Sequence, residues 1–331
     1  MSTTRVPWQA KYLALSLIWG SSFLFMKVGL AALRPIQVSS ARIVLGAAIL
    51  LVLLRATGGH LPRERTTWLH LLVCSLFLTV LPFTGFVVGE QYVSSALAGI
   101  GNATTPIATV LVGLVLLPGH RVERAKLAAV LLGFGGVIVI AEPWNSAGRP
   151  DPLGFLSVVL SGCCYGIGWN YNRRFLADAD LGGLSQPTAM LVCGSVLTVP
   201  VLLGWWLLHR DQAATPFSLA QAPPGGPEHP TWLALTCVAV LGLVGTGIAY
   251  TFQYDVVRAA GAVVSATVTY LIPVVSVLLG VLLLGEHLGP AQLLGFLVVL
   301  AAAVAINRRP RAVPVATAEP PVGDDAPRLT T

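Results

Sequence analysis

Charged side chains are scarce in this sequence. Only 10% of its 331 residues are Asp, Glu, Lys or Arg, whereas 55% are hydrophobic. Soluble domains carry roughly 25% charged residues, which supply the polar surface that water requires. The composition therefore excludes a water-soluble globule and indicates that lipid is the solvent of this chain.

Motifs for catalysis and for metal or nucleotide binding are also missing from the sequence. There is no DxxD pair, no HExxH and no GxxxxGK[ST], and these patterns respectively mark metal-diphosphate, zinc and ATP sites. The five cysteines form no CxxC, are odd in number and lie in apolar runs, which favours a role in helix packing. We therefore predict no catalytic residue, no metal and no cofactor.

Long apolar segments fill most of the chain. A membrane-spanning helix needs about 20 mainly apolar residues, and ten segments meet this requirement. Short charged or Pro/Gly-rich connectors separate most of them. The predicted helices are 12–33, 37–55, 68–89, 96–117, 125–142, 153–173, 187–208, 231–253, 260–284 and 290–307.

Two distant segments share one pattern. The sequence PVVSVLLGVLLL, which starts at Pro273, resembles PIATVLVGLVLL, which starts at Pro106. Both have a proline, a hydroxyl three residues later and a glycine (Gly113, Gly280) four residues beyond that, and Gly295 follows in the next predicted helix of the second copy. A helical hairpin used twice predicts that the chain consists of two homologous halves.

The basic residues predict how the helices are oriented. Lys and Arg in short loops stay in the cytoplasm. With the N-terminus inside, fourteen Lys and Arg lie on the inner side and three, Arg34, Arg149 and Arg210, on the outer side. Both termini are thus predicted to be cytoplasmic, in a multi-pass protein of the cell (plasma or inner) membrane.

Five helices per half is an odd number, so the two halves must have opposite orientations. The predicted fold is an all-α integral membrane protein with ten transmembrane helices in two inverted five-helix repeats, the architecture of many secondary transporters. The repeats span 12–142 and 153–307. A cytoplasmic N-terminus (1–11), a linker (143–152) and a disordered cytoplasmic tail (308–331) complete the chain.

Several short strings follow one another in a characteristic order along the chain. They are Trp19-Gly20-Ser21-Ser22-Phe23 with Lys27, Pro35 with Arg42, Gly245-Thr246 with Ala249-Tyr250, Tyr270-Leu271 with Pro273, and Leu284-Gly285-Glu286 with Gln292 and Gly295. In these strings the chain resembles the EamA family of the drug/metabolite transporter superfamily. The resemblance implies two inverted five-helix repeats and a transporter, often an exporter of amino acids or other metabolites. Two departures are Pro118-Gly119-His120, where the family pattern places Gly-Glu, and Gly194, where the repeat places a partner for Arg42.

Candidate substrate-cavity residues are the polar and aromatic side chains within the predicted helices. Arg42 is the clearest, because a charge at membrane depth costs roughly 2.5–3.5 kcal/mol to insert and therefore suggests a function. A structural role for Arg42, with bonds to backbone carbonyls, is an equal alternative. Hydroxyl groups that join helices are the alternative for the Ser and Thr residues. The candidates are Trp19, Arg42, Asn102, Thr105, Tyr165, Trp169, Tyr250, Ser265, Thr269 and Tyr270.

Three charged residues at helix ends are candidates for gates. Lys27 and its inverted counterpart Arg173 lie near opposite membrane surfaces, where they either act at a gate or extend into the headgroups. Glu286 is expected mainly as a cap for the predicted helix 290–307, with a proton-sensitive gate as the alternative. Because no acid lies deep in a predicted helix, we expect facilitated diffusion, exchange, or coupling through a group at a helix end.

The sequence thus predicts an ATP-independent secondary transporter of small metabolites. Its deep cationic groups favour anionic or zwitterionic solutes, and amino-acid export is the leading interpretation. A carrier of sugar nucleotides or lipid-linked solutes is the alternative, and an intramembrane transferase or a membrane receptor would be different classes. The predicted partners are a small solute and the bilayer, without nucleic acid; the sequence leaves open whether the chain is a monomer or a homodimer.

Overall fold

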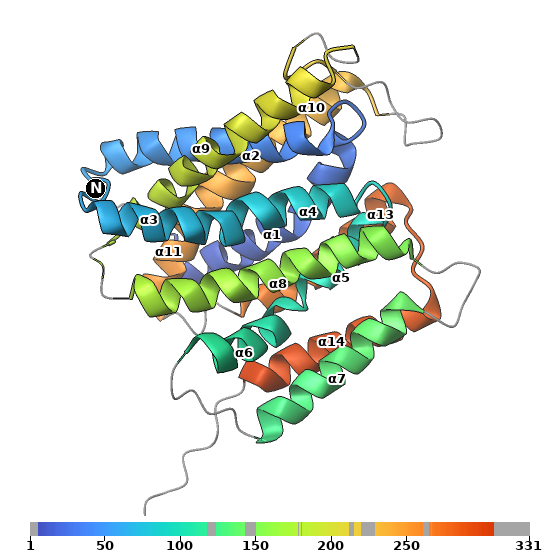
Figure 1. Cartoon of the computed structure of the whole chain (residues 1–331). Helices are drawn as coiled ribbons and strands as arrows, with labels where there is room; N and C mark the ends of the chain where they lie inside the picture. Colours follow the sequence, from blue (N-terminus) through green and yellow to red (C-terminus); the bar gives the residue numbers. More distant parts are fainter. Residues whose placement is uncertain are drawn as a thin grey trace, which may run out of the picture.

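The computed structural model describes residues 6–117, 124–142, 150–177, 179, 181–211, 215–219, 229–260, 265 and 267–307. All regular structure in these ranges is helical (Figure 1). The single-element spans are α1 (Trp8–Gly29), α2 (Pro35–Ala56), α7 (Arg124–Ala141), α8 (Pro152–Phe175), α9 (Ser185–Leu208), α13 (Val268–Leu284) and α14 (Pro290–Asn307).

Three further spans are composed of consecutive helical elements. Two of them contain a π-helical stretch, and the third is interrupted at Ala103 and Thr104. They are α3 (Arg65–Ser75), η1 (Leu76–Val80) and α4 (Leu81–Gly89); α5 (Ser95–Asn102) and α6 (Thr105–Leu116); and α10 (Thr231–Gly242), η2 (Leu243–Ile248) and α11 (Ala249–Ala260).

Local sequence explains several of the helix ends. Proline, which needs no backbone N–H partner at the start of a helix, lies in the first turn of α2, α6 and α8. The Asp151 carboxylate accepts a bond from the Gly154 N–H at 2.8 Å and so caps α8. Gly285 ends α13 at a φ of 63°, a left-handed conformation that favours glycine.

Seven of the described helical spans are long and apolar enough to cross a membrane, and three shorter helices, Leu127–Ala141, Val268–Leu284 and Pro290–Ala305, are also apolar. Each predicted segment coincides with one of these spans, with shifted boundaries. The segment predicted to end at 253 continues to Ala260, and the described helix after it begins at Val268. Residues 118–120, residues 143–149 of the predicted linker and the predicted tail 308–331 lie outside the described residues.

The helices pack in a defined set of pairs. α1 packs against α13, α10 and α11, whereas α8 packs against α6 and α4. α2 contacts α9, and α7 lies beside α14 along one edge of the bundle (Figure 1). The two π-helical stretches begin at Leu76 and Leu243, which are 167 positions apart, the same spacing as between Pro106 and Pro273.

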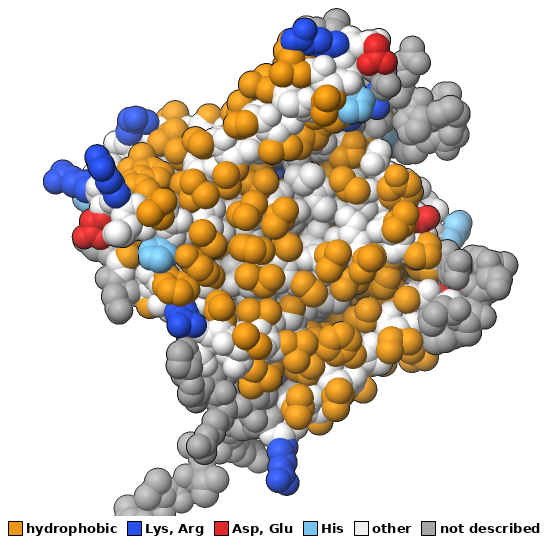
Figure 2. Space-filling view, in the orientation of Figure 1, with side chains coloured by type: hydrophobic (Ala, Val, Ile, Leu, Met, Phe, Trp, Pro, Cys, Tyr) orange, Lys and Arg blue, Asp and Glu red, His pale blue; other side chains and the backbone are white. Residues whose placement is uncertain are grey.

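Hydrophobic side chains cover the visible face of the bundle between its two ends (Figure 2). Leu131, Leu156 and Val196, on α7, α8 and α9, are all more than half exposed, as expected for side chains that contact lipid. We call the two ends the Lys11 end, where α1 begins, and the Lys27 end, where α1 finishes. Charged side chains gather at the rims of this face.

Candidate functional site

Arg42 is a buried arginine near the centre of the bundle. Its side chain, two turns into α2, is 7% exposed. Nε donates a hydrogen bond to Oγ1 of Thr246 in η2 at 3.0 Å, and Nη1 contacts Sδ of Met26 at 3.7 Å. The guanidinium lies 3.8 Å from the centre of the Phe83 ring. The predicted alternative for Arg42 was a set of bonds to backbone carbonyls. Among the described residues, no backbone carbonyl accepts a hydrogen bond from its side chain.

Aromatic side chains from opposite halves of the chain surround this arginine. Tyr165 on α8 and Tyr250 on α11 both interact electrostatically with Arg42. The Tyr250 ring meets the Trp19 ring edge-on, with ring centroids 6.3 Å apart. The ring centroids of Tyr165 and Phe86 are 6.1 Å apart. The structure thus brings four of the sequence-predicted residues, Trp19, Arg42, Tyr165 and Tyr250, to one region.

Each of the two π-helical stretches contains a threonine at the equivalent position, but of the two only Thr246 bonds an arginine. Thr246 accepts the bond from Arg42, whereas Thr79, 167 positions earlier, lies opposite Gly194. A Cβ placed on Gly194 would be 2.9 Å from Oγ1 of Thr79. Thr79 bonds instead to Ser75 in its own span. The region therefore contains an arginine beside Thr246, whereas the equivalent Thr79 has a glycine beside it.

Two predicted polar candidates have buried hydroxyl groups that find no hydrogen-bond partner among the described residues. They are Thr105, at the start of α6, and Ser265. Asn102, the last residue of α5, is also buried, and the interruption at Ala103 and Thr104 separates it from Thr105. Thr269 and Tyr270 are half-buried on α13. A polar solute or water could satisfy the two free hydroxyls.

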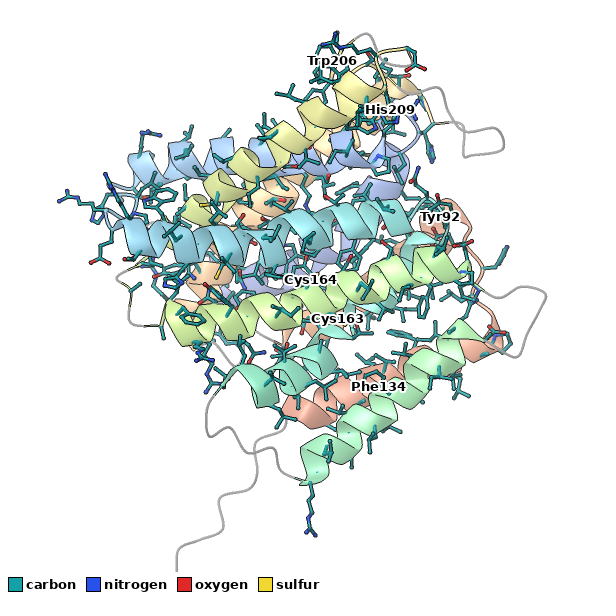
Figure 3. The ribbon with its side chains drawn as sticks, viewed as in Figure 1. Tyr92, Phe134, Cys163, Cys164, Trp206 and His209 are labelled. Carbon is teal, nitrogen blue, oxygen red and sulfur yellow. The ribbon has the colours of Figure 1, made fainter. Side chains whose placement is uncertain are left out.

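Two predicted residues of α8 do not point into this region. Trp169 is 44% exposed, and Arg173 is exposed near the Lys11 end. The buried neighbour Asn170 uses its amide to bond the backbone oxygens of Thr109 and Gly166 at 2.9 and 2.8 Å. Figure 3 places Cys163 and Cys164 at mid-length of the same helix.

Glu286 caps a different helix from the one that the sequence suggested. Its carboxylate accepts bonds from the N–H groups of Ser95 and Ala96 at 2.7 and 2.9 Å, and from Oγ of Ser95 at 3.1 Å. These groups begin α5, not α14. The prediction of the partner was wrong because an N-terminus distant in sequence lies closer than the adjacent one, where Gln292 bonds the Gly289 N–H.

The repeat residues serve helix packing and helix ends. Pro106 stands in the first turn of α6, and Pro273 is buried within α13. Gly113 is buried on α6. A Cβ on Gly295 would lie 2.7 Å from the backbone oxygen of Gly136, so glycine permits the close approach of α14 to α7. Gly280 lies against the Glu286 carboxylate, where a Cβ would not fit.

Lys27 lies at the end of α1 and bonds inward rather than extending to the headgroups. Its Nζ donates to the backbone oxygens of Glu90 and Val93, the latter at 2.9 Å. A pocket of about 320 Å³ is lined by Lys27, Glu286, His229, Leu283 and Leu284. Lys27 therefore links α1 to the turn after α4 beside this pocket.

Sequence reasoning missed Glu90. It directly follows the predicted helix 68–89, and the structure likewise places it directly after α4. Its side chain is nevertheless 0% exposed, and among the described residues neither carboxylate oxygen has a hydrogen-bond partner. Its position at a helix end agrees with the expectation that no acid lies deep in a predicted helix, but the burial of its carboxyl group was not foreseen.

Comparison with known proteins identifies the family. The profile of the EamA-like transporter family matches the chain twice, over residues 8–141 and 152–308. The chain belongs to this family. The resemblance inferred from the sequence motifs is thus confirmed, and the protein is a membrane transporter by family.

Relatives of this EamA-like chain carry transporter names. It is 24% identical over 313 residues to the uncharacterized inner membrane transporter YedA of Escherichia coli K12, covering 95% of this chain and 94% of YedA. It is 24% identical to the uncharacterized transporter YvbV of Bacillus subtilis, over 90% of each chain. It is 23% identical to the protein PecM of Dickeya dadantii, over 88% and 89% of the two chains.

One solved crystal structure has a similar fold. The TM-score is 0.56 at 20% sequence identity, with 91% of this chain and 96% of the other covered. At this identity the likeness concerns the fold alone. The family and the relatives' names indicate a transporter rather than an enzyme.

Proposed function

We propose that this protein is an ATP-independent carrier of small anionic or zwitterionic metabolites, with amino acids as the leading class, and that it exports them. The observation that supports this proposal is the burial of the Arg42 charge without an acidic partner in the part of the chain that the structure describes. Among the described residues Arg42 has no acidic partner within ion-pair distance, and its bonds go to one hydroxyl and one thioether. A charged side chain within the membrane is costly and typically marks a substrate or ion pathway.

The chemistry of the guanidinium group suggests what it binds. Arginine has five N–H donors in a planar fork, of which two are used here. A carboxylate can accept two parallel bonds from such a fork, and a charge-assisted pair of this kind is stronger than a neutral hydrogen bond. The solute would thus supply the counter-charge that Arg42 lacks, next to Tyr165 and Tyr250.

The ten-span, inverted-repeat architecture is part of this proposal. The packing is consistent with it: exchanging each span for its equivalent in the other half turns the α1–α13 contact into the α8–α6 contact and maps α2–α9 and α7–α14 onto themselves. Two separate matches to one family profile and the equal spacing of η1 and η2 support it as well. Many secondary transporters bind their solute between such repeats.

In the proposed orientation the Lys11 end faces the cytoplasm. An ion pair between Lys11 on α1 and Asp255 on α11 crosses this end, and the Tyr12 hydroxyl bonds Thr267 at 2.8 Å. The pocket beside Lys27 lies at the other end. This arrangement suits an outward-facing state of an alternating-access cycle, in which the inner contacts open when the outer pocket closes.

Flux measurements in liposomes test the proposed function. Purified full-length protein is reconstituted and screened with amino acids, organic anions, cationic dyes and sugar nucleotides. We expect amino acids or organic anions to cross faster than in empty liposomes, and R42A to abolish the difference, whereas R174A, at an exposed arginine of α8, retains it. Selective passage of sugar nucleotides would favour the alternative carrier, and formation of a product from lipid substrates without flux would favour a transferase.

A further inference from the structure

Glu90 is a completely buried carboxyl group that no donor satisfies in the part of the chain that the structure describes. It directly follows Gly89, the last residue of its spanning helix. An ionised carboxylate without a partner is costly to bury, so a group in this position takes up a proton instead. Burial accordingly raises the pKa of Glu90 well above the ordinary value for a glutamic acid.

Lys27 is the nearest cation that opposes this protonation. It is the largest of the charges that lower the pKa of Glu90. In the structure, however, its ammonium bonds the backbone oxygens of Glu90 and Val93, and no ion pair joins it to the Glu90 carboxylate, both residues being described. The arrangement is therefore that of a protonated Glu90 beside a lysine held by other acceptors.

Glu286 provides a contrast within the same cluster. It is close enough to Glu90 to raise its pKa by repulsion, yet its own carboxylate accepts three bonds at the start of α5. Of the two neighbouring acids, one thus has a carboxylate that donors satisfy, and the other has no donor among the described residues.

The remaining charged groups around Glu90 do not neutralise it. Arg42, on α2, lowers its pKa least of the groups that act on it. Asp151, at the exposed start of α8, uses its carboxylate on the Gly154 N–H. His229 lines the pocket with Lys27 and Glu286, and its Nε2 is buried without a partner among the described residues. Lys27 and Glu286, whose charges both act on Glu90, therefore also line this pocket.

We propose that Glu90 is the proton-binding site of the transport cycle and that Lys27 is the cation which replaces the proton. When the O–H bond of Glu90 breaks, the proton passes to water in the pocket. The Lys27 ammonium then leaves the backbone oxygens of Glu90 and Val93 and pairs with the new carboxylate. Because those two bonds tie α1 to the turn after α4, proton loss changes the contact between the two helices. This inference rests on the proposed transport function.

Figure 3 shows the position of this turn through Tyr92, which lies at the end of the bundle near α13. The turn, α1 and the residues after α13 thus meet in one place, as the bonds of Lys27 and Glu286 require. A change of partner at Lys27 would act on the elements that surround the pocket.

Infrared titration of the purified protein tests proton binding without any solute. A carbonyl band from a protonated carboxylic acid should persist at pH values where free glutamic acid is ionised. E90Q should remove this band, and the matched variant E64Q, at the other end of the same span, should keep it. K27M should move the titration of the band to higher pH, because it removes the charge that opposes protonation. A band unchanged in E90Q would overturn the proposal.

A second experiment separates coupling from transport. Liposomes containing the protein are given a mixture of the standard amino acids, and exchange of labelled amino acids at equal concentrations is compared with uptake driven by a pH gradient. One coupled proton sustains an about tenfold solute gradient per pH unit, or about 1.4 kcal/mol. We expect E90Q to retain exchange and to lose the pH-driven gradient.

The outcomes of the second experiment are distinguishable. Equal pH-driven gradients in the wild-type protein and in E90Q would overturn the role of Glu90 while leaving the carrier intact. No exchange in the wild-type protein would instead count against amino acids as its solutes, and the infrared titration would still decide whether Glu90 binds the proton.

Discussion

Gly280 and Glu286 form one unit at the end of α13. A Cβ placed on Gly280 would lie 2.3 Å from Oε2 of Glu286, and the Glu286 N–H bonds the Gly280 backbone oxygen at 3.1 Å. The glycine of the repeat pattern therefore makes room for the carboxylate that holds the start of α5. This is a packing role that the first half cannot share in the same form, because its turn has no corresponding glutamate.

The variant G280A should destabilise the protein by about 1–3 kcal/mol, the usual cost of overpacking a filled site. The extra methyl group displaces the carboxylate from Ser95 and Ala96. Thermal unfolding in detergent measures the effect. The matched control is G204A on α9, where a Cβ would meet nothing within 4 Å, and which should be neutral or stabilising. Equal midpoints for the two variants would contradict this assignment.

The Thr246 hydroxyl is expected to orient Arg42 for solute binding. Hydrogen bonds to charged groups are worth about 1.5–3 kcal/mol, so T246V should raise KM by about tenfold or more. T79V is the control, because Thr79 faces Gly194 rather than an arginine. Flux in liposomes measures both variants. A KM that rises equally in the two would show that the threonines serve the π-helical stretches and not the arginine.

The Lys11–Asp255 ion pair is expected to hold the Lys11 end closed. Either single change, K11D or D255K, places two like charges together and should favour opening of this end. The double exchange should restore the wild-type behaviour, because it restores the attraction. Labelling of a cysteine introduced at Thr267, which bonds Tyr12 at the same end, reports access from the cytoplasmic side. Labelling that is the same in all variants would exclude a gate at this pair.

Glu90 should make the stability of the fold depend on pH. Its pKa is raised in the folded state, so between the unfolded and the folded value the folded protein binds more protons. Stability then falls as pH rises through this window, by up to about 1.4 kcal/mol per pH unit. Chemical unfolding at several pH values measures the slope, and E90Q should flatten it. A slope that is unaffected by E90Q would assign the dependence to another group.

The sequence predicted the helical segments well, because a membrane demands long apolar runs and short polar connectors. Arg42 and the aromatic residues Trp19, Tyr165 and Tyr250 also stand out against an apolar background, and the structure brings these four side chains to one region, but their role in solute binding stays a prediction. The sequence could not predict which helices these side chains face. Trp169 and Asn170 illustrate the limit: their positions differ by one residue, and only packing determines that the tryptophan is exposed and the asparagine buried.

Glu286 and Glu90 mark the other limit of sequence reasoning. The sequence places both at helix ends, where an acid ordinarily meets water or the nearest helix N-terminus. In the structure Glu286 caps α5 by bonding Ser95, which is 191 positions away in the sequence. Glu90 is enclosed, and no donor among the described residues bonds its carboxyl group. Contacts between distant segments decide the environment of both carboxyl groups, and no local pattern encodes such contacts.

Solute flux by R42A and R42K in liposomes tests the central proposal most directly. Lysine keeps the charge but not the planar fork, so it cannot form the paired bonds with a carboxylate. We expect R42A to abolish the flux of amino acids or organic anions and R42K to retain a small part of it, while both variants fold and pass size-exclusion chromatography as the wild-type protein does. Wild-type flux in well-folded R42A would contradict the account.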